Sequence, residues 1–269
     1  MEAPAFIGLL GQLLNFGTAE IHALVAVFTR VGAVIALLPG FGEQTLPARV
    51  RLGAAIAFTL VVWPPVAETA ASTPGIGDDS AITLTRFLLA EAAVGLMLGI
   101  AIRLMVMALQ LAGSIAAQAT SVAQIAGAGV TPDPMPAIGN MLTVSGIAMA
   151  LAMGLHIKAA IVMIGSYNIV PLGVFPLSGD VAKWGVARAS DAFALAFSLA
   201  APFVIASFAY NIALGAINRA MPQLMVALVG APAITAGALF ILWLSGPIAI
   251  AHWSDMLDLV LMNPFGMPE

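Results

Sequence analysis

The sequence predicts an all-α protein that crosses a lipid bilayer with about six long helices. Hydrophobic residues make up 61% of its 269 residues, and charged residues only 8%. No Asp, Glu, Lys or Arg occurs between Arg219 and Asp255, and other long stretches come close to that. A soluble domain of this length needs far more polar surface, whereas each membrane-spanning helix needs about 20 apolar residues. We therefore expect a polytopic membrane protein.

The composition also excludes several other classes of protein. The chain has no Cys, which excludes disulfide frameworks and thiolate metal sites. The net charge of −4, without a basic patch, argues against a nucleic-acid partner. The N-terminal sequence has no basic region, so we expect insertion without cleavage of a signal peptide. No metalloprotease, serine hydrolase or nucleotide-binding motif occurs, so we expect neither catalysis nor a cofactor.

Apolar stretches separated by Pro- and Gly-rich breaks define the expected helices. The long helices are predicted over Ala19–Pro39, Arg51–Val66, Ala81 to about Gln124, Ile138–Ser166, Asp191–Arg219 and Gln223–Ile250. A short amphipathic stretch at Phe6–Phe16 precedes them. The second helix is expected to end at Pro64-Pro65, because proline lacks the helical N–H and clashes with the preceding turn. Glu68–Ser80 and Asp180–Asp191 are expected to be polar connections, and Asp255–Glu269 an acidic tail.

The third predicted helix contains charges that do not suit an isolated membrane span. Its Ala81–Gln118 part alone would be about 57 Å long, whereas the hydrocarbon layer is about 30 Å thick. Glu91 and Arg103 lie about 18 Å apart along this helix and on different faces, so they cannot neutralise each other. Either charge at the centre of a bilayer would cost about 2.5–3.5 kcal/mol. We expect these two groups, with Arg30 and Arg219, to be buried in pairs between helices or between subunits.

The segment Gly113–Pro136 combines small residues, an uncharged polar face and a helix-breaking end. The polar side chains fall within about 120° of one helical face. The candidate pore or plug residues are Gly113, Ser114, Gln118, Ser121, Gln124, Gly127, Gly129, Asp133 and Pro134. Such a segment suits a constriction that passes different substrates. The other interpretation is close helix packing through small residues, and composition alone favours packing over a constriction.

Two short motifs in this half of the chain each have two interpretations. Gly95 and Gly99 form a G-x-x-x-G, which allows close approach of helices within the chain or with a partner. Gly75-Ile76-Gly77-Asp78 resembles the G-x-G-D string of intramembrane aspartyl proteases, which need two facing carboxylates. Here the string lies in a polar linker, so a solvated turn is favoured over a protease site.

A resemblance to a known family extends over nearly the whole chain. The matching residues are Arg30, Pro39, Pro47, Arg49–Leu52, Glu91, Gly95, Gly99, Ala112-Gly113, Gln118, Asp133-Pro134, Gly154, His156, Ser166, Pro171–Gly173, Ala201-Pro202 and Asn211–Gln223. The last run is the most specific, because it places Gly215, Arg219 and Pro222-Gln223 where two apolar helices connect. On these residues the chain resembles the FliR/SctT family, a membrane component of the flagellar and type III secretion export gate.

The resemblance implies partners, a location and a function. The chain would assemble with FliP-like and FliQ-like subunits and a FlhB-like switch protein, in the bacterial inner membrane at the flagellar basal body. Residues 1–188 would be FliP-like, with a plug loop at 113–136, and residues 189–269 would form a FliQ-like helical hairpin with the tail. The expected function is to form a pore for unfolded export substrates. The alternative is a secondary transporter of a small solute, although such folds usually show inverted repeats and paired broken helices.

Overall fold

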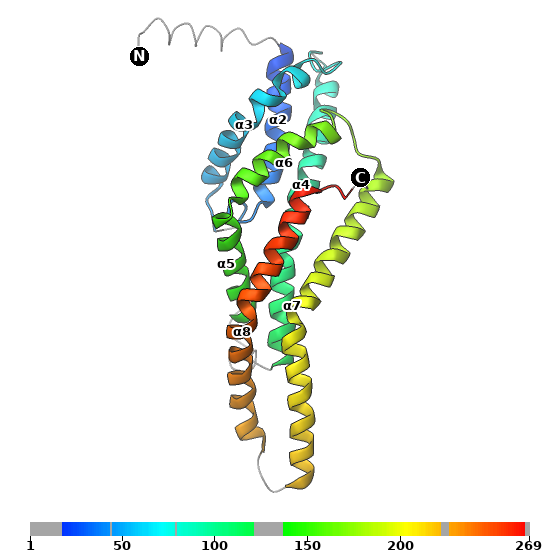
Figure 1. Cartoon of the computed structure of the whole chain (residues 1–269). Helices are drawn as coiled ribbons and strands as arrows, with labels where there is room; N and C mark the ends of the chain where they lie inside the picture. Colours follow the sequence, from blue (N-terminus) through cyan, green and yellow to red (C-terminus); the bar gives the residue numbers. More distant parts are fainter. Residues whose placement is uncertain (1–17, 44, 79, 121–136, 222–225, 267–269) are drawn as a thin grey trace, which may run out of the picture. The chain divides into compact units, whose positions relative to one another are not determined.

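The computed structural model describes residues 18–43, 45–78, 80–120, 137–221 and 226–266, and every regular element within them is an α-helix (Figure 1). The helices are α2 (Thr18–Leu37), α3 (Ala48–Ala71), α4 (Ala81–Ala119), α5 (Ala137–Ala152), α6 (Leu155–Ile169), α7 (Ser178–Ala220) and α8 (Val226–Met262). Among them, 5 are long and apolar enough to cross a membrane, and α5 with α6 would make a sixth span. The predicted all-α membrane class is confirmed. The predicted stretch at Phe6–Phe16 lies outside the described residues.

The chain packs into two compact units. The first contains residues 1–101, 156–182 and 263–269, and the second contains residues 102–155 and 183–262. Helices α4 and α7 therefore contribute to both. These units reflect packing within one chain. The predicted division after residue 188 concerns likeness to partner subunits, and it stays a prediction.

Helix α2 buries one of its faces within the first unit. Its buried residues recur every three or four positions, which places them on one side of the helix. They are Ala23, Ala26, Val27, Arg30, Val31, Val34 and Ile35. Helix α4 approaches α2 closely at Gly95, where an added Cβ would collide with the Arg30 carbonyl oxygen. At Gly99 an added Cβ would lie 2.9 Å from the Leu37 Cβ. The G-x-x-x-G motif thus serves packing inside the chain.

Helix α3 does not end at the proline pair, so that boundary prediction was wrong. Pro64 and Pro65 lie inside the helix, which continues to Ala71. Ser72 then donates its backbone N–H to the Glu68 carbonyl oxygen over 3.1 Å. Both prolines are exposed, and the helix continues through them although neither has an N–H to donate to the preceding turn.

The predicted fourth helix is broken into two. Helices α5 and α6 are separated at Met153-Gly154, and Gly154 has a φ of 78°. A left-handed residue of this kind commonly ends a helix, and glycine adopts it without the steric cost of a Cβ. The predicted polar connection at Asp180–Asp191 is also helical, because α7 begins at Ser178 and places Asp180 in its first turn. An acidic side chain is favourable at that end of a helix dipole.

In the second unit, the burial of α8 differs between its most apolar part and its last turns. Only 6% of its most apolar window is buried. Its last turns carry a buried stripe that includes Trp253, Leu257 and Leu261. The predicted acidic tail therefore begins as packed helix, and α8 ends only at Met262. The prediction of a tail rested on the acidic residues Asp255 and Asp258. These residues lie among apolar residues at helical spacing, which is compatible with a packed helix.

Candidate functional site

A buried ion pair joins α2 to α4 in the first unit. The Arg30 Nε donates to Glu91 Oε2 over 2.8 Å, and the Arg30 Nη2 donates to Glu91 Oε1 over 3.0 Å. Both side chains are 0% exposed. The two parallel bonds match the fork geometry in which guanidinium and carboxylate bind most strongly. The charge that the sequence places inside α4 is therefore neutralised by another helix of the same chain.

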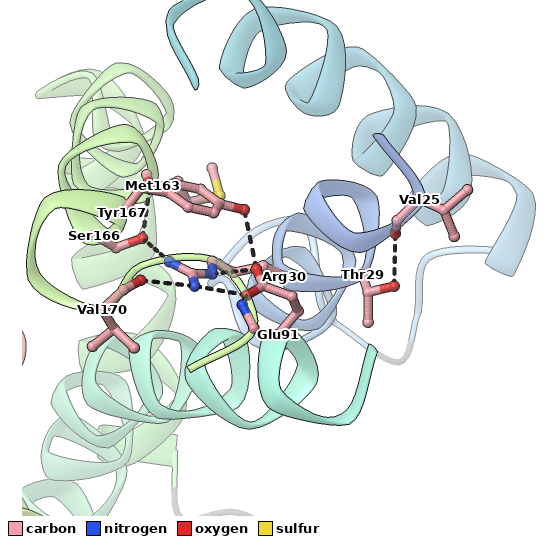
Figure 2. Close-up of polar contacts among 9 residues, drawn as sticks. Val25, Thr29, Arg30, Glu91, Met163, Ser166, Tyr167 and Val170 are labelled. Atoms are coloured by element: carbon pink, nitrogen blue, oxygen red, sulfur yellow. Dashed lines mark hydrogen bonds and ion pairs between the residues drawn. The ribbon is translucent and has the colours of Figure 1, made fainter. Parts of the chain in front are cut away.

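Helix α6 and the turn after it complete this arrangement (Figure 2). The Arg30 guanidinium donates to Ser166 Oγ over 2.9 Å and to the Val170 carbonyl oxygen over 3.0 Å. The Glu91 carboxylate accepts from the Tyr167 hydroxyl over 3.3 Å and from the Gly173 N–H over 2.9 Å. The Arg30 Cζ also lies 3.8 Å from the Tyr167 ring centroid. We call these six residues the Arg30 network.

The intact Arg30 network adds little net stability, but the loss of one of its charged partners is costly. Desolvating two charges costs several kcal/mol for each ion, which a bidentate pair with further hydrogen bonds roughly offsets. Loss of one partner, in contrast, leaves a bare buried charge and costs about 3–5 kcal/mol. The network thus holds α2, α4 and α6 in one register. Tyr167 also lines a small cavity of about 130 Å³, whose lining residues do not include Arg30 or Glu91.

Sequence reasoning selected Arg30 and Glu91 separately but did not pair them with each other. It compared Glu91 only with Arg103, because both lie on one predicted helix. Ser166 and Gly173 were noted only among the residues that carry the family resemblance, and Tyr167 and Val170 were missed. A usable signal was present, since a buried Arg and a buried Glu on different apolar helices each require an opposite charge.

The other two selected charges lie elsewhere. Arg103 is half-buried in α4, within the second unit. Arg219 is exposed in the last turn of α7, where a positive charge complements the carboxyl end of the helix dipole. Neither belongs to the Arg30 network. Burial of Arg219 between subunits remains a proposal.

The candidate pore segment is described only at its start. Gly113 is buried at a close crossing of α4 and α5, where an added Cβ would collide with the Gly139 Cα. Ser114 is half-buried and Gln118 is exposed. The remaining candidates lie outside the described residues; they are Ser121, Gln124, Gly127, Gly129, Asp133 and Pro134. At Gly113, the geometry is that of close helix packing.

The G-x-G-D string lies in a turn between α3 and α4. Gly75 has a φ of 82°, and the Asp78 N–H donates to the Gly75 carbonyl oxygen over 3.2 Å. The His22 Nδ1 lies 2.9 Å from the Ile76 carbonyl oxygen, which ties this turn to α2. Asp78 is exposed. This arrangement is the predicted solvated turn.

Comparison with known proteins agrees with the helical membrane architecture. Residues 21–260 match the model of a family described as bacterial export proteins, family 1. The flagellar biosynthetic protein FliR of Caulobacter vibrioides is 31% identical over 89% of this chain and 95% of its own length. The FliR protein of Bacillus subtilis is 30% identical over 78% of this chain and 80% of its own length, and that of Escherichia coli K12 is 25% identical over 76% of each. The chain therefore belongs to bacterial export protein family 1, the FliR/SctT family, and is a membrane-embedded component of the flagellar export apparatus.

Proposed function

We propose that this chain, together with FliP-like and FliQ-like subunits, forms the pore of a flagellar-type export gate in the bacterial inner membrane. The pore passes unfolded protein substrates, and a FlhB-like protein assembles with the gate. The residues 1–188 form the FliP-like part of the chain, and the residues 189–269 form a FliQ-like hairpin. The chain itself performs no chemistry in this proposal.

The observation that carries the proposal is the amount of apolar helix surface that the chain leaves uncovered. On α7, Phe193, Phe197 and Phe208 are 55%, 60% and 67% exposed, and they fall on one helical face. On α8, Trp243 and Ile248 are 73% and 70% exposed. Surfaces of this kind require lipid or other helices as cover. A hairpin of α7 and α8 that packs beside similar hairpins would cover them.

Within this pore, we assign the plug to residues 113–136. The assignment rests on the sequence, whose glycines and prolines suit irregular backbone that lines a channel. The described start of the segment supports a firm anchor, because Gly113 packs directly on α5. In the proposal, Gln118 begins the part that faces the passing substrate.

Co-purification with the neighbouring export subunits tests the proposal. The tagged full-length chain is produced together with the FliP-like and FliQ-like proteins and extracted from membranes in mild detergent. We expect the three proteins to elute as one complex from the inner-membrane fraction. Elution of this chain alone, as a stable and monodisperse particle, would contradict the proposal. Uptake of a small solute into liposomes by the chain alone would favour the transporter alternative.

A further inference from the structure

An open groove of about 430 Å³ lies beside the first turns of α4 in the first unit. It is lined by Ala81, Ile82, Thr85, Arg86, Leu89 and Phe175. Its size falls within the usual range for small-molecule sites. It is separate from the Arg30 network, because its α4 side chains point away from the buried face that carries Phe87, Ala90 and Glu91.

The groove presents an apolar stripe that the described part of the chain leaves uncovered. Ile82, Arg86 and Leu89 are spaced four and three residues apart, so they share one face of α4. Ile82 is 83% exposed and Leu89 is 58% exposed. Phe175, from the turn after α6, is 46% exposed and also lines the groove. These side chains suit an extended hydrocarbon chain lying along the helix.

Arg86 gives the groove a single positive charge. Its side chain is exposed and makes no ion pair or hydrogen bond with the residues that the structure describes. The hydroxyl of the neighbouring Thr85 donates to the Ala81 carbonyl oxygen over 2.7 Å, so it is occupied by its own helix. The five N–H donors of the Arg86 guanidinium are therefore available to an anion, and their fork geometry suits phosphate.

Arg86 lies near the end of α4 that adjoins a polar turn. Helix α4 is one of the apolar candidate spans, and it follows directly on the polar turn at residues 72–78. Arg86 lies about 8 Å along the axis from the first residue of the helix. A basic side chain near the end of a membrane helix reaches the interface, where it attracts anionic headgroups.

From this juxtaposition we propose that the groove binds an anionic phospholipid, with the phosphate on Arg86 and an acyl chain along Ile82, Leu89 and Phe175. A partner helix is a less suitable occupant, because it would have to bring a carboxylate to Arg86 and an apolar stripe to Ile82 and Leu89 in one register. A phospholipid supplies the negative charge at the headgroup and the apolar chain next to it. The proposal goes beyond the export function and does not depend on it.

Lipid retention and photolabelling test the proposal on the full chain. The protein is purified with its export partners and mixed with phosphatidylglycerol or phosphatidylcholine, and retained lipid is counted by native mass spectrometry. We expect preferential retention of phosphatidylglycerol, with about a fivefold loss of affinity in Arg86→Gln, as expected for one interfacial cation. Arg86→Lys should restore most of the binding. Phosphatidylglycerol with a photoreactive acyl chain should label residues 82–89 or Phe175.

Arg49→Gln is the matched control, because Arg49 is exposed at the start of α3 and does not line the groove. It should leave labelling of the groove unchanged. Equal retention of both lipids, or unchanged labelling in Arg86→Gln, would overturn the proposal. If Arg86→Gln instead reduces recovery of an export partner while lipid labelling persists, the occupant is a protein helix and the proposal is also wrong. Leu89→Glu, an exposed substitution, repeats the test by placing negative charge beside the acyl chain, and it should abolish labelling.

Discussion

The Trp253 Nε1–H on α8 donates a hydrogen bond of 2.7 Å to the Met105 carbonyl oxygen on α4. Trp253 is 0% exposed, and its ring lies against α5 at Gly146, where an added Cβ would lie 3.5 Å from the indole, at ordinary contact distance. Three helices of the second unit therefore meet at one indole. This contact packs the end of α8 against the second unit, whereas Leu239, Trp243 and Ile248 earlier in the helix are exposed.

Shortening Trp253 should show how far this contact stabilises the second unit. Trp253→Phe removes the hydrogen bond and part of the ring, and should destabilise the chain by about 1 kcal/mol or somewhat more. Trp253→Ala also leaves a cavity and should cost about 3–5 kcal/mol. Thermal unfolding in detergent measures both. As a control, Trp243→Phe changes a Trp that is 73% exposed and should leave the unfolding temperature nearly unchanged. Equal losses of unfolding temperature at Trp253 and Trp243 would mean that the Trp253 contact does not stabilise the second unit.

The Arg30 network should show strong coupling between its two charges. Arg30→Met leaves the Glu91 carboxylate buried without its partner, and should destabilise the chain by about 3–5 kcal/mol. Glu91→Leu leaves the Arg30 guanidinium buried without its partner, and should destabilise the chain by a similar amount. The double variant removes both charges, so it should be less destabilised than the sum of the single variants. Strictly additive losses of unfolding temperature would mean that the two side chains do not stabilise each other.

Gly113 is expected to be intolerant of even one methyl group. Gly113→Ala places a Cβ against the Gly139 Cα, so α4 and α5 must separate, at a cost of about 1–3 kcal/mol. Gly165→Ala is the matched control, because a Cβ there meets nothing within 4 Å. Alanine stabilises a helix relative to glycine, so the control should be neutral or slightly stabilising. Thermal unfolding of the two variants distinguishes close packing from a freely moving segment.

Much of the fold could be predicted from the sequence, because long apolar stretches leave the chain few alternatives to helices in a membrane. The boundaries were harder. Pro64 and Pro65 are poor helix residues wherever they occur, yet α3 continues through both of them to Ala71. The break at Gly154 depends on a left-handed backbone that one glycine among many adopts.

The Arg30 network could be predicted only in part. Apolar helices make any buried charge conspicuous, so Arg30 and Glu91 were selected. Their pairing depends on which faces of α2 and α4 meet, and this is decided by close contacts at Gly95 and Gly99. Ser166 and Val170 join through α6, whose orientation depends on the break before it. Such contacts arise from packing and are not encoded by local periodicity.

Shortening the proposed plug should open the membrane barrier. Deletion of residues 127–131 removes Gly127 and Gly129, two of the three candidate glycines of the segment, so the closed pore should leak small ions and dyes. Dye entry into cells that produce the deleted chain with its export partners measures this. The same deletion produced without those partners is the control, and it should not leak, because no pore assembles. A tight barrier in both strains would refute the plug assignment.

Arg219 should matter more for assembly than for folding. It is exposed at the end of α7, so Arg219→Ala should lower the unfolding temperature of the isolated chain only slightly, through loss of its interaction with the helix dipole. It should, however, reduce recovery of the FliP-like and FliQ-like subunits in detergent pull-downs. Lys183→Ala, at an exposed position in the same helix, is the control and should preserve recovery. Undiminished recovery in Arg219→Ala would remove this residue from the proposed interface.

The central claim is that an unfolded substrate passes along this chain, and cross-linking to a stalled substrate tests it most directly. The chain has no Cys, so Gln118→Cys introduces a unique thiol at the start of the proposed pore segment. A substrate fused to a domain that cannot unfold is trapped during export and carries a thiol-reactive cross-linker. We predict a cross-link to Gln118→Cys and none to Lys183→Cys. A trapped substrate that reacts with neither position, in cells whose gate is assembled, would contradict the account.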